Sequence, residues 1–358
     1  MNFLTIQPGH IYRPKSSVPQ PGLPALVHQF ERDQIRAVNA ALAAGRPLLV
    51  RGEPGIGKSQ LAKAVAGELQ RAFISQTVDS RTESRDLLYH FDAVARLADA
   101  QILGCQPKAS IDNSSEAKED KKQTAACKVS TQLLPPADYL RPRALWWAFA
   151  WEDAKGRAEK AGIGIPKNPE GWEPKHGCVV LIDEIDKAES DVPNGLLEAL
   201  GAHSFHPQGL GRPVVASSTP PLVIITTNEE RALPDAFVRR CLVLHLQLPK
   251  ERNRLKEHLI SRGQAHFEGM TSNNVLQTAA DCLIDDRQEA AQQHWHPLPG
   301  QAEYLDLLRA VIGQRSNDHS AQEELLAEIK RFILRKHPDA ATEDMRTEET
   351  AANLEAIP

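Results

Sequence analysis

The residues best suited to chemistry lie in a glycine-rich stretch, GEPGIGKS, at positions 52 to 59. Its key positions are Gly52, Gly57, Lys58 and Ser59, with four residues between the two glycines. Glycines let backbone N–H groups turn toward a phosphate, while the lysine adds positive charge and the serine hydroxyl can bind Mg²⁺. This spacing predicts a phosphate-binding loop.

The residues on either side of the loop support that prediction over the alternative, a glycine-rich turn without a ligand. The apolar run 47–50 predicts a strand, and the pattern of residues 61–69 predicts an amphipathic helix. The loop then lies at a helix N-terminus, where unpaired N–H groups and the helix dipole favour an anion. We expect the nucleotide contacts to come from Gly52, Pro54, Gly55, Ile56, Gly57, Lys58, Ser59 and Gln60.

A second reactive stretch is CVVLIDEIDKA, residues 178–188, in which a run typical of a buried strand ends in Asp183 and Glu184. Ligands bind at this carboxyl edge in open α/β sheets. Two buried acids cost several kcal/mol unless a cation or donors compensate them. We expect Asp183, with Ser59, to hold Mg²⁺, and Glu184 to polarise the water that attacks the γ-phosphate. The alternative is an acidic pair that only caps the next helix.

A third apolar run, residues 221–227, ends in Asn228, whose amide can position the same water. Further along are Arg239 and Arg240, directly before the apolar run 241–246. Paired arginines of this kind are either solvated surface charge or groups that stabilise negative charge on a transferring phosphate.

Composition limits the class of protein. The chain has 358 residues, of which 41% are hydrophobic and 25% charged, and a net charge of −5 that gives no support for nonspecific nucleic-acid or anionic-membrane binding. The five cysteines are scattered, which is typical of reduced thiols. No segment reaches the roughly 18 apolar residues of a membrane span. We therefore expect a cytoplasmic protein.

The chain divides into segments of different character. We expect an extended arm over residues 1–30, an α/β domain over 31–248 and a helical domain over 249–337. Helical patterns that alternate with short apolar runs indicate a parallel sheet covered on both faces. The polar insertion 104–137 and the acidic tail 338–358 have few large apolar residues and are predicted to be disordered.

Two segments allow two interpretations each. The helical stretch 140–160 contains Trp146, Trp147 and Trp151, which either pack within their own domain or contact a neighbouring subunit. The charged stretch 79–86 is either a loop that contacts a substrate or a source of ion pairs between subunits.

Four motifs together resemble those of an AAA+ ATPase over roughly residues 32–310. RGEPGIGKS, VVLIDEID, VIITTN and LPDAFVRRC resemble Walker A, Walker B, sensor 1 and the arginine-finger box, in that order. The long stretch between the second strand and Walker B, with residues 86–91 and 139–149, is similar to the helix-2-insert branch. DEIDKAESDVPNGLLEAL is most similar to the MoxR-like and dynein-related families within that branch.

This resemblance implies a fold and an assembly. The fold is a P-loop NTPase αβα sandwich with a parallel sheet of order 5-1-4-3-2, followed by a small α-helical lid. The assembly is a hexameric homo-oligomer with ATP and Mg²⁺ between subunits. Arg240, with Arg239 as its neighbour, would then act on the nucleotide of the next subunit, where a guanidinium is worth about 10³-fold or more in rate.

The lid departs from the pattern of the family. Sensor 2 often supplies an arginine near the start of a lid helix, but this chain has Gln301 there and its first arginine at Arg309. We do not expect Arg309 to reach the nucleotide, so the sensor 2 function is in question. Base contacts are expected from residues 27–30 and the lid, and the sequence leaves ATP or GTP open.

The leading hypothesis is a MoxR-like AAA+ ring ATPase that remodels or matures a protein partner, which in this family is often a von Willebrand factor A-type protein. One alternative is a nucleic-acid-directed McrB-like motor, possibly using GTP, although no basic stripe or recognition domain supports a nucleic-acid partner. Another is a nucleotide-switched scaffold with low turnover, which Gln301 favours and Glu184 disfavours.

Overall fold

The structure, a computed structural model, describes residues 3–14, 27–105, 134–216, 219–316 and 318–337. The disorder predicted for most of the insertion, and for the acidic tail, concerns residues outside these ranges. Those two predictions therefore stay predictions.

A five-stranded parallel sheet forms the centre of the N-terminal domain, with the order β11-β3-β10-β7-β4. In the register, Ile224 lies opposite both Leu48 and Leu181, which belong to the two flanking strands. This is the predicted order 5-1-4-3-2, so the predicted fold class is confirmed. The strands are β3 (Leu48–Gly52), β4 (Ala72–Thr77), β7 (Cys178–Asp183), β10 (Leu222–Thr227) and β11 (Leu242–Leu246).

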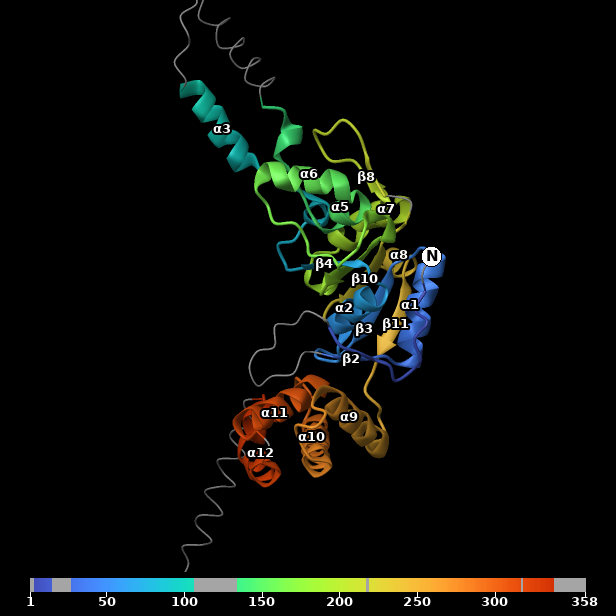
Figure 1. Ribbon diagram of the computed structural model, residues 1–358, viewed down its shortest axis with the longest axis vertical. Helices are drawn as coiled ribbons and strands as arrows, with labels where there is room; N and C mark the ends of the chain where they lie inside the picture. The colour runs from blue at the N-terminus through green and yellow to red at the C-terminus, as the bar shows by residue number, and fades with distance from the viewer. Residues whose placement is uncertain (1–2, 15–26, 106–133, 217–218, 317, 338–358) are drawn as a thin grey trace, which may run out of the picture.

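Helices cover both faces of this sheet (Figure 1), because successive side chains of a strand point to opposite sides. Leu48 and Val50 belong to the core beneath α1 (Arg32–Ala44) and α2 (Lys58–Glu68), whereas Leu49 belongs to the core on the other face. The helices of that other face are α5 (Ala144–Phe149), α6 (Trp151–Ala161), α7 (Asp191–Ala202) and α8 (Asp235–Val238).

The tryptophan-rich stretch forms two helices, α5 and α6, rather than one, because the backbone at Ala150 leaves the helical region (φ −137°, ψ 71°). Trp146, Trp147 and Trp151 are all buried in the core of their own domain. The Trp146 indole N–H donates to Asp153 over 2.8 Å. Of the two interpretations, packing within the domain is confirmed.

The N-terminal arm lies against the domain. The amide of Leu4 donates to the Asn39 side chain on α1 over 2.8 Å, and Leu4 is buried in the core beneath that helix. Strand β1 (Ile11–Tyr12) pairs antiparallel with β2 (His28–Gln29). The other described elements of this domain are α3 (Ala93–Cys105), β5 (Tyr89–Phe91), β6 (Leu140–Pro142), β8 (Ser204–Phe205), β9 (Val214–Val215) and the 3₁₀ turns η1 (Ser84–Leu87), η2 (Pro136–Tyr139), η3 (Pro174–His176) and η4 (Ile185–Lys187).

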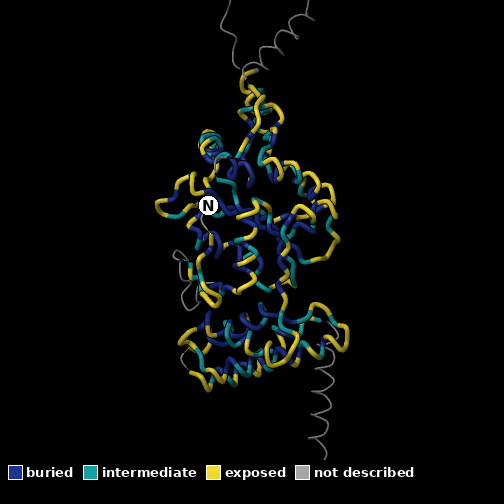
Figure 2. The backbone as a smooth tube through the Cα atoms, turned by 90° about the vertical axis from the view of Figure 1, so that its right-hand side faces the viewer, coloured by how far each residue is buried: buried dark blue, intermediate teal, exposed yellow. Residues whose placement is uncertain are grey.

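After β11 the described chain is helical and has its own core, which includes Leu259, Leu283 and Leu308. Figure 2 shows buried residues gathered both around the sheet and within this smaller unit. No helix of the described ranges has the length and apolar character needed to cross a membrane. The helices of this unit are α9 (Arg252–His266), α10 (Asn273–Gln292), α11 (Gln301–Gln314) and α12 (His319–Leu334).

Contacts between charged side chains and backbone groups join the helical unit to the sheet domain. Arg262 on α9 donates to the backbone oxygen of Gln29 over 2.5 Å and forms an ion pair with Glu31. Arg287 on α10 donates to both carboxylate oxygens of Glu53, at 2.7 and 2.8 Å. These contacts hold the helical unit across the carboxyl edge of the sheet.

Candidate active site

A cleft of about 370 Å³ lies between the glycine-rich loop, the carboxyl ends of β7 and β10, the β2 segment and helix α11. Of the predicted site residues, Gly52, Arg239 and Arg240 do not line it. The others do, so residues far apart in the sequence meet at one place: Pro54, Gly55, Ile56, Gly57, Lys58, Ser59, Gln60, Asp183, Glu184 and Asn228.

The glycines of the loop are required by its backbone. Gly57 precedes α2 with φ of 99°, in a left-handed conformation that side chains disfavour. Gly52 has no room for a side chain, because an added Cβ would lie 2.4 Å from the backbone oxygen of Leu246. The loop can therefore turn its N–H groups inward at the start of a helix, as an anion site requires.

Lys58 joins the loop to the end of β10. Its ammonium donates to the backbone oxygens of Gly52 and Glu53, at 2.7 and 2.9 Å, and to the Asn228 side-chain oxygen at 2.7 Å. Burial lowers the pKa of Lys58, and four neighbouring carboxylates, Asp183 first among them, oppose that shift. A positive charge is therefore held in the cleft beside the predicted water-positioning amide.

Ser59 and Asp183 meet as the sequence predicts. The Ser59 hydroxyl lies 2.9 Å from each carboxylate oxygen of Asp183. Thr226 adds a donor that the sequence reasoning missed: its hydroxyl donates to Asp183 over 2.5 Å and accepts the amide N–H of Glu184 at 2.9 Å. The carboxylate of Asp183 is thus oriented from two sides.

Ser59 and Asp183 are suited to a Mg²⁺ ion that binds together with a phosphate group. Ser59 and Asp183 offer hard oxygen donors, and Mg²⁺ usually binds through one or two protein oxygens, substrate phosphates and water. Within the part of the chain that the structure describes, no group of three or more His, Cys, Asp or Glu side chains could form an all-protein metal site. Ser59 and Asp183 are the residues that would hold the ion.

Glu184 has a strained backbone and a paired side chain. Its φ of 61° and ψ of 47° lie in the left-handed region, which for a residue other than glycine is costly and common at functional sites. Lys187 donates to the Glu184 carboxylate over 2.7 Å. The carboxylate lines the cleft but must leave this ion pair to act as a proton acceptor.

Asp186, which the sequence reasoning also missed, is the most buried acid of this loop, with 1% of its surface exposed. Its carboxylate accepts the backbone N–H groups of Asn228 at 3.2 Å and Glu230 at 3.0 Å. It therefore ties the loop after β7 to the loop after β10 and holds Asn228 in place.

Replacing Asp186 by alanine is expected to lower the free energy of unfolding by about 2 to 4 kcal/mol, because two N–H groups lose their acceptor in a buried site. Nucleotide turnover should fall with it, since Asn228 loses its support. Denaturant unfolding and phosphate release measure both effects, with Glu189→Ala as the control because that carboxylate is 78% exposed. Unchanged stability of Asp186→Ala would contradict this role.

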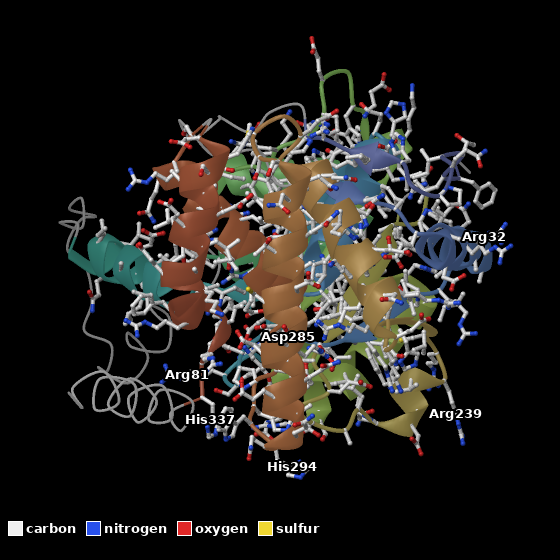
Figure 3. All side chains as sticks on the ribbon, turned by 90° about the horizontal axis from the view of Figure 1, so that it is seen from below. Arg32, Arg81, Arg239, Asp285, His294 and His337 are labelled. Carbon is white, nitrogen blue, oxygen red and sulfur yellow. The ribbon has the colours of Figure 1, made fainter. Side chains whose placement is uncertain are left out.

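Arg239 and Arg240 lie outside the cleft of their own chain, at the end of α8. Both are exposed, and Figure 3 shows Arg239 at the periphery of the molecule. Arg46 donates to the backbone oxygens of both residues, at 3.0 Å for Arg240. The backbone that carries the two guanidinium groups is therefore fixed, and the Arg240 guanidinium donates to the backbone oxygen of Ala236 over 3.1 Å.

Helix α11 closes the cleft from the other side. Gln301 is buried and accepts a hydrogen bond from His258 at 2.9 Å, and the Ala302 side chain packs on Gly55. Arg309 also lines the cleft, where it donates to Asp306 over 2.5 Å, and the expectation that it does not reach the nucleotide stays a prediction. It reaches the cleft because α11 runs along it instead of pointing away.

The buried His28 gives the fold a dependence on pH. Burial lowers its pKa from 6.5 to about 4, against the opposing hydrogen bond with Gln34. His28 therefore binds a proton more readily in the unfolded chain than in the folded chain. The folded state loses stability as the pH falls below 6.5. From the pKa shift of His28 alone, the free energy of unfolding should be about 2 kcal/mol lower at pH 5 than at pH 7.5. Thermal unfolding should show a smaller pH effect in His28→Gln, and equal effects would contradict the assignment.

The fold and the cleft define a P-loop nucleotide-binding domain of the AAA type. Residues 47–262 match the AAA domain family, dynein-related subfamily, and the chain belongs to that family. Membership implies nucleotide binding in general. No curated protein matches the chain.

Two solved structures are similar to the chain. One is a proposed ATPase from Cytophaga hutchinsonii, with 13% identity, 91% of this chain and 88% of that chain covered, and a TM-score of 0.31. The other is a RuvB mutant from Thermotoga maritima, with 14% identity, 77% and 68% covered, and a TM-score of 0.35.

Proposed function

We propose that the chain binds ATP with Mg²⁺ in this cleft, hydrolyses it, and works as a MoxR-like ring ATPase on a protein partner. The observation that supports this most strongly is the meeting of the phosphate loop, the Ser59–Asp183 pair, Glu184 and Asn228 at one sheet edge. Each group has a role there that phosphoryl transfer to water requires.

The roles follow from the contacts. Lys58 and the loop N–H groups would bind the β- and γ-phosphates, and Lys58 would exchange its present bonds to Gly52 and Glu53 for phosphate oxygens. Glu184, once free of Lys187, would accept a proton from the attacking water, which Asn228 orients. When bound, Mg²⁺ neutralises charge on the phosphates. No group of one chain's own cleft serves as an arginine finger in this scheme.

The position of Arg239 and Arg240 supports a ring. Both are exposed, remote from their own cleft, and carried on a backbone that Arg46 holds. A guanidinium placed this way can stabilise the γ-phosphate of a neighbouring subunit. By resemblance to the family, we propose a hexamer.

Mass photometry of the purified chain without nucleotide and with ADP, ATP and GTP tests the ring. We expect ATP to shift the mass from one chain toward six. A single-chain mass under all four conditions would contradict the ring.

For the partner, the family resemblance supports a protein client, for example a von Willebrand factor A-type protein. The scaffold alternative has one observation in its favour: Lys187 pairs with Glu184 over 2.7 Å and would restrain turnover. Phosphate release by Lys187→Ala distinguishes an ATPase motor from a scaffold with low turnover. Faster release supports a restrained motor, whereas an absence of release from both wild type and variant supports the scaffold.

A further inference from the structure

The end of the cleft away from Lys58 is lined by other residue types than the phosphate loop. Helix α11 begins at Gln301, beside Gly57, and Arg309 follows eight residues later, which is about 12 Å along a helix. That length separates the far end of the cleft from the phosphate loop. Besides the phosphate loop and the ends of β7 and β10, the residues that line the cleft are Val27, His28, Gln29, Lys63, Arg262, His266, Gln301, Ala302, Leu305, Asp306 and Arg309.

His266, in the last turn of α9, is the unusual residue among them. It lines the cleft with only 8% of its surface exposed. Among the residues that the structure describes, neither of its ring nitrogens has a hydrogen-bond partner. These nitrogens are not among the buried side-chain atoms that lack a partner, so they open onto the cleft and are available to a ligand.

Two other histidines nearby, the buried His28 and the partly buried His258, are paired, unlike His266. His28 bonds with Gln34 at 3.0 Å, and His258 with Gln301 at 2.9 Å. Burial, helped by nearby arginines, lowers the pKa of His266 to about 4, so its ring is neutral at neutral pH. A neutral imidazole offers one donor and one acceptor.

Both arginines at this end of the cleft already have partners. The Arg262 guanidinium already binds the Gln29 backbone oxygen at 2.5 Å and pairs with Glu31. Arg309 is paired with Asp306 at 2.5 Å. With both cations compensated, a neutral group that combines apolar faces and polar edges suits the site, and a nucleoside has that chemistry.

We propose that His266 hydrogen-bonds the nucleoside part of the bound nucleotide and determines which nucleoside the cleft prefers, an inference that rests on the proposed function. The phosphate loop supplies affinity for the phosphates alone, so the contribution of His266 can be measured separately.

Calorimetric titration with ADP, GDP and inorganic pyrophosphate tests this, since none of them is consumed during the measurement. His266→Ala should bind ADP about tenfold or more weakly, the effect of losing about 1.4 kcal/mol of hydrogen bonding. It should bind pyrophosphate as wild type does, and its ratio of ADP to GDP affinity should change. His319→Ala, an exposed histidine of the same helical unit, is the control.

His266→Asn, which keeps a donor and an acceptor, should recover part of the ADP affinity and serves if the alanine variant does not fold. Unchanged ADP affinity, or an equal loss for ADP and pyrophosphate, would overturn the role of His266. A wild-type protein that binds neither ADP nor pyrophosphate would instead overturn the proposed function, and this inference with it.

Discussion

Glu184→Gln is expected to abolish ATP hydrolysis while ATP binding persists. Glutamine keeps the shape of the side chain but cannot accept a proton, and general-base catalysis is worth about 10² to 10⁴-fold in rate. Binding should survive because, in the proposed site, Lys58, Ser59 and Asp183 would hold the phosphates and Mg²⁺. The ion pair with Lys187 is lost as well, so the amide is free to enter the cleft.

Phosphate release and calorimetric ATP binding, measured on the same preparation, decide the outcome for Glu184→Gln. The matched control is Glu189→Gln, in the same loop region but with an exposed carboxylate. If Glu184→Gln turned over ATP at the wild-type rate, Glu184 would not be the base. The acidic pair at the end of β7 would then have the capping role that the sequence left open.

Arg240→Ala is expected to bind ATP normally and to lose about 10³-fold in turnover, because a guanidinium stabilises charge that develops on the transferring phosphate. Arg240 is exposed and lies outside the cleft of its own chain, so the loss must arise at a subunit interface. Arg212→Ala, which removes another exposed arginine, is the control.

A mixture of two variants tests whether Arg240 acts across a subunit interface. Lys58→Ala subunits keep the finger but lack a working phosphate loop, whereas Arg240→Ala subunits keep the loop but lack the finger. A mixture should regain phosphate release that neither variant has alone. Wild-type turnover by Arg240→Ala, or no recovery in the mixture, would count against action across the interface. Arg239→Ala tests the neighbouring arginine in the same way.

The sheet was predictable because its strands are short, mainly apolar runs, the central ones buried on both faces, and helical patterns separate each strand from the next. Lys58, Ser59, Asp183, Glu184 and Asn228 were predictable for a related reason. Each follows an apolar run or sits at a glycine spacing, and parallel strands bring their carboxyl ends to one edge. The register between Ile224 and Leu48 then determines which side chains meet.

Other residues of the site could not be predicted, because their contacts depend on how distant segments pack and no sequence pattern marks them. Thr226 belongs to an apolar strand, and nothing in its neighbours indicates that its hydroxyl reaches Asp183. Asp186 looks like an ordinary surface acid until the loop after β10 folds over it. Arg309 and His266 face the cleft only because α9 and α11 pack across the sheet edge, which is a contact between distant segments.

The central claim, that this cleft is an ATPase site, is tested most directly by phosphate release from ATP with Mg²⁺, comparing wild type with Lys58→Ala. Lys58 contacts both the loop and Asn228, and its loss should remove phosphate binding and with it turnover. We predict steady release by the wild-type protein and none above background by the variant. Equal release by the two proteins, or none by the wild type, would contradict the claim.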